Sequence, residues 1–291
     1  HVSGDHYTIS EAWLDRVQEV LDYAVDDDMY VILNIHHDTD KEYCYPDKEH
    51  LEQSLSYMTF IWEQLADRFG DYDEHVIFES INEPRLVETD HEWWLDMNAA
   101  ECVEAVECIN EWNQNFVDVV RKTGGNNATR YLMVPGYDAS ADGVLNDKFV
   151  LPTDTAENEG KILVSVHAYI PYHFALQAAT ENESIDQFNA SEKTSTNDID
   201  QMMEKLYAKY ISNEIPVVIG EFGARDKNGN LQSRVDYAAY YIAAARAYGM
   251  NCNWWDNNAF TGDGELFGLL DRKTVTWRYP KIVDALMKYA E

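Results

Sequence analysis

The sequence is short of cysteines and has no long apolar run, and each shortage excludes a class of protein. Four cysteines occur among 291 residues, and none of them forms a C-x-x-C pair. A dense disulfide framework and a cysteine metal site are therefore not expected, although a single disulfide stays open. No stretch of roughly 18 or more consecutive apolar residues occurs, which argues against a membrane-spanning helix.

Basic residues are also scarce. Lysine and arginine total 22 against 53 acidic residues, which gives a formal net charge of -31. A field of this sign repels phosphate backbones and anionic lipid surfaces. Neither nucleic acid nor a membrane is expected as a partner, whereas neutral polymers and cations remain open.

The apolar residues that are present alternate between short runs and longer segments of helical period. With 45% apolar residues, the chain is large enough to bury a substantial core. Helical spacing predicts helices, the first with a capping box at Thr8 and Glu11, over 8–25, 48–69, 98–122, 198–211, 231–248 and 278–290. Near-continuous apolar runs predict buried strands at 30–37, 75–83, 131–136, 161–169, 216–223 and 251–256.

Strands interleaved with helices predict an α/β fold with a parallel sheet. No linker rich in proline or serine interrupts the series, so we expect one domain over residues 1–291. Long inserts at 38–47, 137–160 and 170–197 all follow strands, where the loops of parallel α/β folds build the active face. No G-x-G-x-x-G or G-x-x-x-x-G-K-[ST] motif occurs, which argues against dinucleotide and nucleotide triphosphate sites.

Residues capable of chemistry close most of the strand segments. They are His36 and His37, Asn82 and Glu83, His167 and Tyr169, Glu221, and Trp254 with Trp255. Two carboxylates facing one pit suit hydrolysis of a glycosidic bond, because one protonates the leaving oxygen while the other attacks the sugar or activates a water. Glu83 and Glu221 are the candidate pair.

The segments "NIHHD", "FESINEPR", "HAYIPYHFAL", "IGEFGA" and "WWDNNAF" resemble the glycoside hydrolase family 5 cellulases, above all their endoglucanase and xyloglucanase branch. The likeness covers essentially the whole chain and implies a retaining enzyme with a (β/α)8 barrel. It implies that Glu83 is the acid/base, that Glu221 is the nucleophile, and that Asn82 holds the sugar 2-hydroxyl.

The resemblance assigns supporting roles to the remaining residues. His167 and Tyr169 would flank the carboxylate pair, and His36 and His37 would line the glycone side. Trp255 would form the platform under the sugar at the cleavage point, with Trp254 as the competing assignment. The family's first two strands, and an arginine that ends the second, would precede residue 1, so we expect a truncated barrel of six βα units.

Several residues have a plainer interpretation. Glu79 shares strand parity with Glu83 but lies deeper, so we expect a buried structural carboxylate tied to an arginine. Arg85 is expected to pair with Glu79 or with a loop carboxylate. Trp93, Trp94 and Trp112 suit core packing as well as sugar binding. His36, His37 and Asp38 could be read as metal ligands, but adjacent strand residues face opposite sides, and no metal or other cofactor is expected.

The sequence therefore predicts a secreted, monomeric, retaining endo-β-1,4-glucanase acting on plant cell-wall β-glucans such as cellulose, xyloglucan or mixed-linkage glucan. A xyloglucanase, lichenase or mannanase of the same family is the alternative specificity. The alternative class is a truncated barrel that binds polysaccharide with little turnover.

Overall fold

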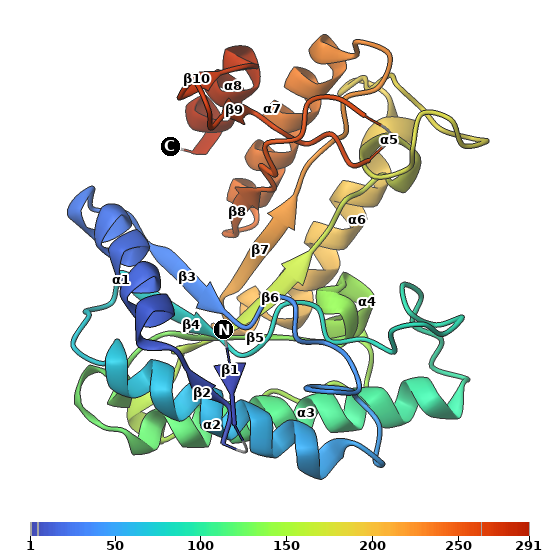
Figure 1. The fold of residues 1–291 in the computed structure, drawn as a ribbon. Coiled ribbons are helices and arrows are strands. Elements are labelled where there is room, and N and C mark those ends of the chain that lie inside the picture. The colour runs from blue at the N-terminus through green and yellow to red at the C-terminus, as the bar shows by residue number, and fades with distance from the viewer. Residues whose placement is uncertain (1, 5, 263, 291) are drawn as a thin grey trace. The chain divides into compact units, whose positions relative to one another are not determined.

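Six parallel strands alternate with helices along the chain, as predicted (Figure 1). The computed structural model describes residues 2–4, 6–262 and 264–290. The strands are β3 (Val31–Asn34), β4 (Val76–Glu79), β5 (Leu132–Pro135), β6 (Ile162–His167), β7 (Val217–Phe222) and β8 (Asn251–Trp254). This series confirms the α/β class.

All six predicted helices are present. They are α1 (Glu11–Asp26), α2 (Leu51–Arg68), α3 (Ala100–Lys122), α6 (Lys193–Lys209), α7 (Leu231–Ala247) and α8 (Pro280–Ala290). The sequence did not predict the shorter elements. These are the helices α4 (Ala141–Leu145) and α5 (Tyr172–Ala175), the 3-10 turns at 125–128, 137–139, 156–158 and 211–213, and the hairpins β1 (Val2–Ser3) with β2 (Thr8–Ile9) and β9 (Leu270–Asp271) with β10 (Thr276–Trp277).

The predicted capping box at the start of the first helix is wrong. Thr8 pairs with Ser3 in the β1–β2 hairpin, so it lies outside the helix. Helix α1 starts at Glu11, and Ser10 at its N-cap makes no side-chain capping hydrogen bond. The pairing of Thr8 in the hairpin took precedence over the local capping signal.

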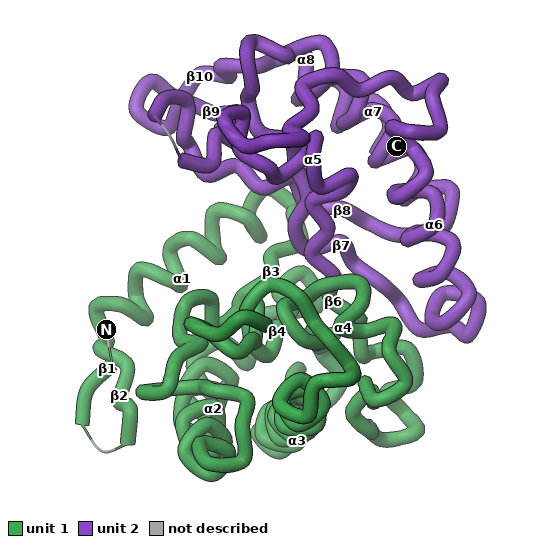
Figure 2. Tube along the Cα trace, turned by 90° about the vertical axis from the view of Figure 1, so that its right-hand side faces the viewer, with its two compact units in different colours: residues 1–165 green, residues 166–291 purple. Residues whose placement is uncertain are grey.

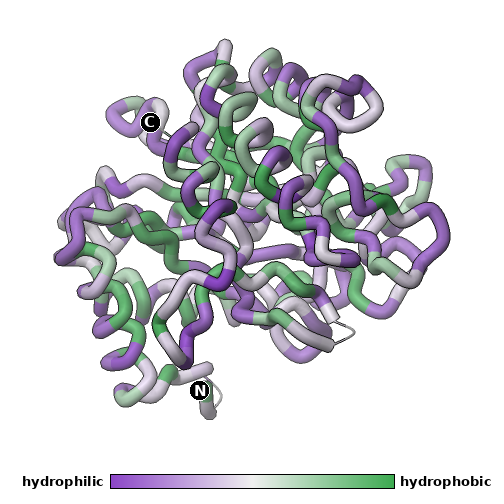
Figure 3. The backbone as a smooth tube through the Cα atoms, turned by 90° about the horizontal axis from the view of Figure 1, so that it is seen from above, coloured by the Kyte–Doolittle hydropathy of each residue, from purple (hydrophilic) through white to green (hydrophobic). Residues whose placement is uncertain are grey.

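The chain forms two compact units, residues His1–Ser165 and Val166–Glu291 (Figure 2). In the first unit, β3, β4, β5 and the start of β6 pair in chain order. Helices α2 and α3 meet over this sheet through Trp62, whose ring centroid lies 4.6 Å from that of Phe116 and 5.3 Å from that of Phe78. Hydrophobic and hydrophilic residues alternate along the helical turns of the chain (Figure 3).

The second unit holds the parallel pair β7–β8 with helices α6, α7 and α8. Helix α7 packs its aromatic residues under β7, where the rings of Phe222 and Tyr241 stack with centroids 4.4 Å apart. Tyr237 is fully buried beside them. These contacts fix the strand that carries Glu221 against a rigid helix.

The cysteines are free thiols, which answers the question that the sequence left open. Cys44, Cys102 and Cys108 are buried and Cys252 is partly buried. Burial raises the pKa of the Cys108 thiol to about 12. Among the described residues, no helix is long and apolar enough to cross a membrane.

Candidate active site

Glu83 lies beyond the end of its strand, in a segment fixed by neighbouring strands. Strand β4 ends at Glu79, so the predicted strand over 75–83 is too long. The following residues still bond like a strand, because Ser80 N–H donates to the Met133 carbonyl at 3.0 Å and Asn82 N–H to the Ile35 carbonyl at 2.9 Å. This segment is therefore rigid enough to aim the Glu83 side chain.

Asn34 at the end of β3 organises the polar residues beneath Glu83. Its amide nitrogen donates to Glu79 Oε2 at 2.8 Å and to Asn82 Oδ1 at 3.4 Å. Ser165 Oγ donates to the other Glu79 oxygen at 2.5 Å. Glu79 is only 3% exposed, which confirms the predicted buried carboxylate, and an amide and a hydroxyl donate to it. Asn82 thereby has its side-chain orientation set from below.

His36 and His37 follow β3 and lie edge to face, with ring centroids 4.6 Å apart. They line a cavity of about 360 Å³ in the first unit, together with Asn34 and Asp38. Apolar residues, among them Trp13, also line this cavity. The sugar-facing role of the two histidines stays a prediction.

Arg85 has a loop carboxylate as partner, as one of the two predicted alternatives had it. Its Nε lies 3.4 Å from Glu92 Oε1, and its guanidinium stacks over the Trp93 ring at 4.0 Å. Trp112 is fully buried in α3, whereas Trp93 and Trp94 are 52% and 63% exposed. The three tryptophans therefore separate into one core residue and two surface residues.

In the second unit, Glu221 stands in β7 between two predicted partners. Tyr169 Oη donates to Glu221 Oε2 at 2.6 Å, and His167 Nδ1 lies 3.7 Å from Glu221 Oε1. Ala168 N–H donates to the Glu221 carbonyl at 2.9 Å, so the end of β6 is hydrogen-bonded beside β7. The structure thus places Tyr169 and His167, which the resemblance put beside the carboxylate pair, next to Glu221.

An irregularity in strand pairing falls at Glu221. Ile219 pairs with Cys252 and Phe222 with Trp254, so two residues of β7 oppose one residue of β8. Bulges of this kind bend a strand and redirect a side chain, and they are common beside active sites. The strict alternation assumed from the sequence does not run undisturbed through β7.

Trp254 and Trp255 differ in their surroundings. Trp254 Nε1 donates to the Phe267 carbonyl at 3.1 Å, and its ring packs against Phe222 with centroids 5.4 Å apart. Trp255 N–H donates to the Phe222 carbonyl at 2.8 Å, which extends the β7–β8 pairing by one residue. Trp254 is therefore held by contacts of its side chain, both tryptophans are partly exposed, and the assignment of Trp255 as the sugar platform stays a prediction.

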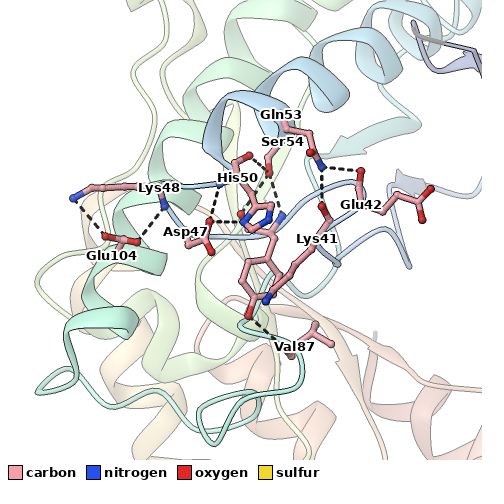
Figure 4. Close-up of polar contacts among 10 residues, drawn as sticks. Lys41, Glu42, Asp47, Lys48, His50, Gln53, Ser54, Val87 and Glu104 are labelled. Carbon is pink, nitrogen blue, oxygen red and sulfur yellow. Dashed lines mark hydrogen bonds and ion pairs between the residues drawn. The ribbon is translucent and has the colours of Figure 1, made fainter.

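The insert that follows β3 is anchored at several points (Figure 4). Gln53 of α2 donates to the carbonyls of Lys41 and Glu42, at 2.9 and 2.8 Å. Asp47 Oδ1 lies 2.8 Å from His50 Nδ1. Tyr45 Oη donates to the Val87 carbonyl at 3.3 Å and so ties the insert to the loop after Glu83. This insert, which belongs to the predicted active face, is therefore held in place by contacts with α2 and with the loop after Glu83.

The insert after β6 is held by a buried lysine. Lys227 is 2% exposed, and its ammonium donates to the His173 carbonyl at 2.7 Å and to Ser184 Oγ and the Ile185 carbonyl at 3.2 Å. Burial, with a smaller effect of Arg225, lowers the pKa of Lys227 to about 8. This side chain connects the loop after β7 with the insert.

Sequence reasoning missed three residues that position the site: Asn34, Tyr137 and Lys227. Asn34 is a polar residue in an apolar strand, and this pattern could have identified it from the sequence. In the structure it pairs in register with Glu79. Tyr137 is fully buried and accepts Leu86 N–H at 3.0 Å, while its own hydroxyl donates to the His91 carbonyl at 2.6 Å. Nothing in the sequence pattern distinguishes Tyr137 or Lys227 from a surface loop residue.

Comparison with known proteins agrees with these features. The sequence pattern of Cellulase (glycosyl hydrolase family 5) matches residues 1–261. The chain belongs to this family, which confirms the resemblance read from its motifs. Endoglucanase B of Ruminococcus albus is 42% identical over the whole chain, and the chain spans 66% of the length of that curated relative.

Solved structures of the family share the fold. A glycoside hydrolase family 5 lichenase from a Caldicellulosiruptor species is 59% identical, with a TM-score of 0.98 over 100% of this chain and 78% of that one. A broad-specificity endoglucanase from Ruminococcus champanellensis, solved with bound cellotriose, is 44% identical, with a TM-score of 0.88 over 99% of this chain and 78% of that one. The fold is the (β/α)8 type, of which the described residues hold six parallel strands.

Proposed function

We propose that the chain is a retaining endo-β-1,4-glucanase that hydrolyses internal bonds of β-glucans. The observation that carries the proposal is the Glu221 carboxylate, which receives the Tyr169 hydroxyl at 2.6 Å at a bulge in β7. Such a carboxylate is held in one orientation, as a nucleophile requires. Membership of the cellulase family and the endoglucanase relatives support the same reading.

In the proposed mechanism, Glu83 protonates the leaving glycosidic oxygen while Glu221 attacks the anomeric carbon and forms a glycosyl-enzyme. Glu83 then removes a proton from the water that hydrolyses this intermediate. While Glu221 is ionised, its charge favours the protonated form of a neighbouring carboxyl, and that charge disappears once the ester forms. One residue thus serves as acid and then as base.

Asn82, fixed by Asn34, would bind the sugar 2-hydroxyl, an interaction that strengthens in the transition state. Trp255 would stack under the sugar at the cleavage point, and His36 and His37 would line the glycone side. His167 and Tyr169 hold the nucleophile. None of these roles requires a metal or another cofactor.

A reducing-sugar assay on carboxymethyl cellulose tests the reaction. We expect hydrolysis by the wild type and loss of at least about 10³-fold in kcat for Glu221→Gln, because an amide cannot form the glycosyl-enzyme. Early release of the β-anomer, followed by NMR, would support double displacement. Early α-anomer, or polysaccharide binding without any release of sugar, would contradict it and favour the binding-protein alternative.

Mixed-linkage glucan is the second candidate substrate, because a family lichenase is 59% identical to this chain. Initial rates on barley β-glucan, carboxymethyl cellulose, xyloglucan and mannan at equal mass concentration rank the specificities. We further propose that the protein acts outside the cell, since insoluble polymers do not enter cells. We also propose that it is a monomer. Fractionation of the source culture and light scattering on the purified protein test these two points.

A further inference from the structure

We propose that Arg85 is a positioning residue for the acid/base: it fixes the main chain of Glu83 and leaves the carboxyl group of Glu83 for the leaving oxygen. The inference rests on the proposed function of Glu83. It assigns a role in the reaction to an arginine that sequence analysis treated as structural.

The contacts of Arg85 separate the backbone of Glu83 from its side chain. Arg85 Nη1 donates to the Glu83 carbonyl at 2.9 Å, which is a full hydrogen bond. The same nitrogen lies 3.9 Å from Glu83 Oε2, which is too far for one. The guanidinium therefore holds the peptide that carries Glu83 without competing for the carboxyl as a hydrogen-bond partner.

A second carboxylate shares the charge of Arg85. Glu92 Oε1 lies 3.4 Å from Arg85 Nε, closer than the Glu83 carboxylate lies to Nη1. A full positive charge beside Glu83 would favour its ionised form and would oppose its action as an acid. Glu92 reduces this effect, so Arg85 can position Glu83 without promoting the loss of its proton.

Trp93 fixes the guanidinium from one face. The ring centroid lies 4.0 Å from Arg85 Cζ, within the range of a cation–π contact. The Arg85 side chain is only 17% exposed, whereas Trp93 is 52% exposed. The indole thus covers one face of the guanidinium and shields it from water.

The surrounding loop is rigid enough for such a role. Asp138 N–H donates to the Pro84 carbonyl at 2.7 Å, directly after Glu83. Tyr137 Oη accepts Leu86 N–H, and Glu88 N–H donates to Glu92 Oε2, both at 3.0 Å. Glu92, Pro84 and Leu86 therefore keep contacts that do not depend on the arginine, and loss of Arg85 would loosen mainly the peptide of Glu83.

Leaving-group dependence tests the proposal. Cellopentaose releases a sugar hydroxyl that must be protonated, whereas 2,4-dinitrophenyl β-cellobioside releases a phenolate that needs no acid. Arg85→Met should lower kcat/KM for cellopentaose by about 10- to 100-fold. It should leave kcat/KM for the aryl cellobioside within about twofold, because attack by Glu221 is unaffected.

Matched variants separate positioning from folding. Arg16→Met removes an arginine that pairs with Glu19 at 2.6 Å on the surface of α1, and it should change neither substrate. Arg85→Lys keeps the charge but loses the planar guanidinium with its several N–H donors, so it should retain the cellopentaose rate only in part. Trp93→Ala should reproduce a smaller selective loss, while Trp277→Ala, at a tryptophan that is also 52% exposed, should not.

The outcomes distinguish this inference from the proposed function. Glu83→Ala should show the same substrate selectivity more strongly. If Glu83→Ala shows this selectivity, but Arg85→Met lowers kcat/KM equally for cellopentaose and the aryl cellobioside, or for neither, the positioning role is overturned. If Glu83→Ala itself shows no selectivity, the acid/base assignment of Glu83 fails instead.

Discussion

Tyr169 and Glu221 are connected twice, once by a side-chain hydrogen bond and once by a backbone hydrogen bond of the residue next to Tyr169. The Tyr169 hydroxyl donates to Glu221 Oε2 at 2.6 Å, and the N–H of the preceding residue, Ala168, donates to the Glu221 carbonyl at 2.9 Å. The backbone contact holds Ala168 beside Glu221, and the phenol then orients the carboxylate. A backbone bond and a side-chain bond together set the orientation of the proposed nucleophile.

Removal of the Tyr169 hydroxyl should therefore impair the reaction more than the fold. We expect Tyr169→Phe to lower kcat/KM on soluble β-glucan by about 10- to 100-fold, since a hydrogen bond to a charged group contributes about 1.5–3 kcal/mol. Tyr240→Phe is the matched control, because Tyr240 also donates to a carboxylate, Asp200, at 2.5 Å. Equal activity of the two variants would exclude an orienting role for Tyr169.

Asn34 should affect both stability and activity. Asn34→Ala removes one donor to the buried Glu79, which should lower the free energy of unfolding by about 1–3 kcal/mol. It also releases the Asn82 amide, so kcat/KM should fall even at temperatures where the variant is fully folded. Asn115→Ala, which breaks a side-chain bond to Thr59 between α2 and α3, should lower stability alone. Urea unfolding and initial rates measure the two effects separately.

The sequence predicted the presence of helices and strands better than it predicted the residues at which they end. Six strands and six long helices follow from apolar periodicity, because burial of one face is what makes both the pattern and the element. The end of β4 could not be predicted, since Ser80 and Asn82 still bond to neighbouring strands although regular pairing ends at Glu79. Short elements such as α5 carry too few residues for a period to appear.

The candidate site shows the same division. Residue types at strand ends, such as Glu83 and Glu221, were predictable because topology gathers those ends. The contacts that hold them were not, since Tyr137 reaches Leu86 across 51 positions and Lys227 reaches His173 across 54. Pairings at such separation depend on packing, which a single sequence does not specify.

Trp254, the last residue of β8, and the adjacent Trp255 should give different phenotypes. Trp254 packs its ring on Phe222 and bonds the Phe267 carbonyl, so Trp254→Ala should lower the free energy of unfolding by about 3 kcal/mol. Trp255→Ala should mainly raise KM for cello-oligosaccharides, because stacking of a sugar ring on the indole is lost. Thermal unfolding and kinetics on both variants check the assignment. The reverse pattern would make Trp254 the platform.

Lys227 should make stability depend on pH in an unusual direction. Burial lowers its pKa to about 8 in the folded chain, below the ordinary value of 10.5. Between these values the unfolded chain binds one proton more than the folded chain, so this group makes the folded state more stable as pH rises. The gain is complete above the unfolded pKa and amounts to at most about 3 kcal/mol.

Comparison with Lys227→Met isolates this effect. The difference in free energy of unfolding between wild type and variant, from urea titrations at pH 7.5 and 10, should grow in favour of the wild type. Lys193→Met is the control, because hydrogen bonding to Asp200 raises the pKa of Lys193 above its ordinary value of 10.5, so the contribution of Lys193 should stay unchanged between pH 7.5 and 10. A difference for Lys227→Met that stays flat or shrinks would mean that the ammonium remains charged among its three oxygen partners. In that case the insert after β6 would be held by a buried cation throughout the working range.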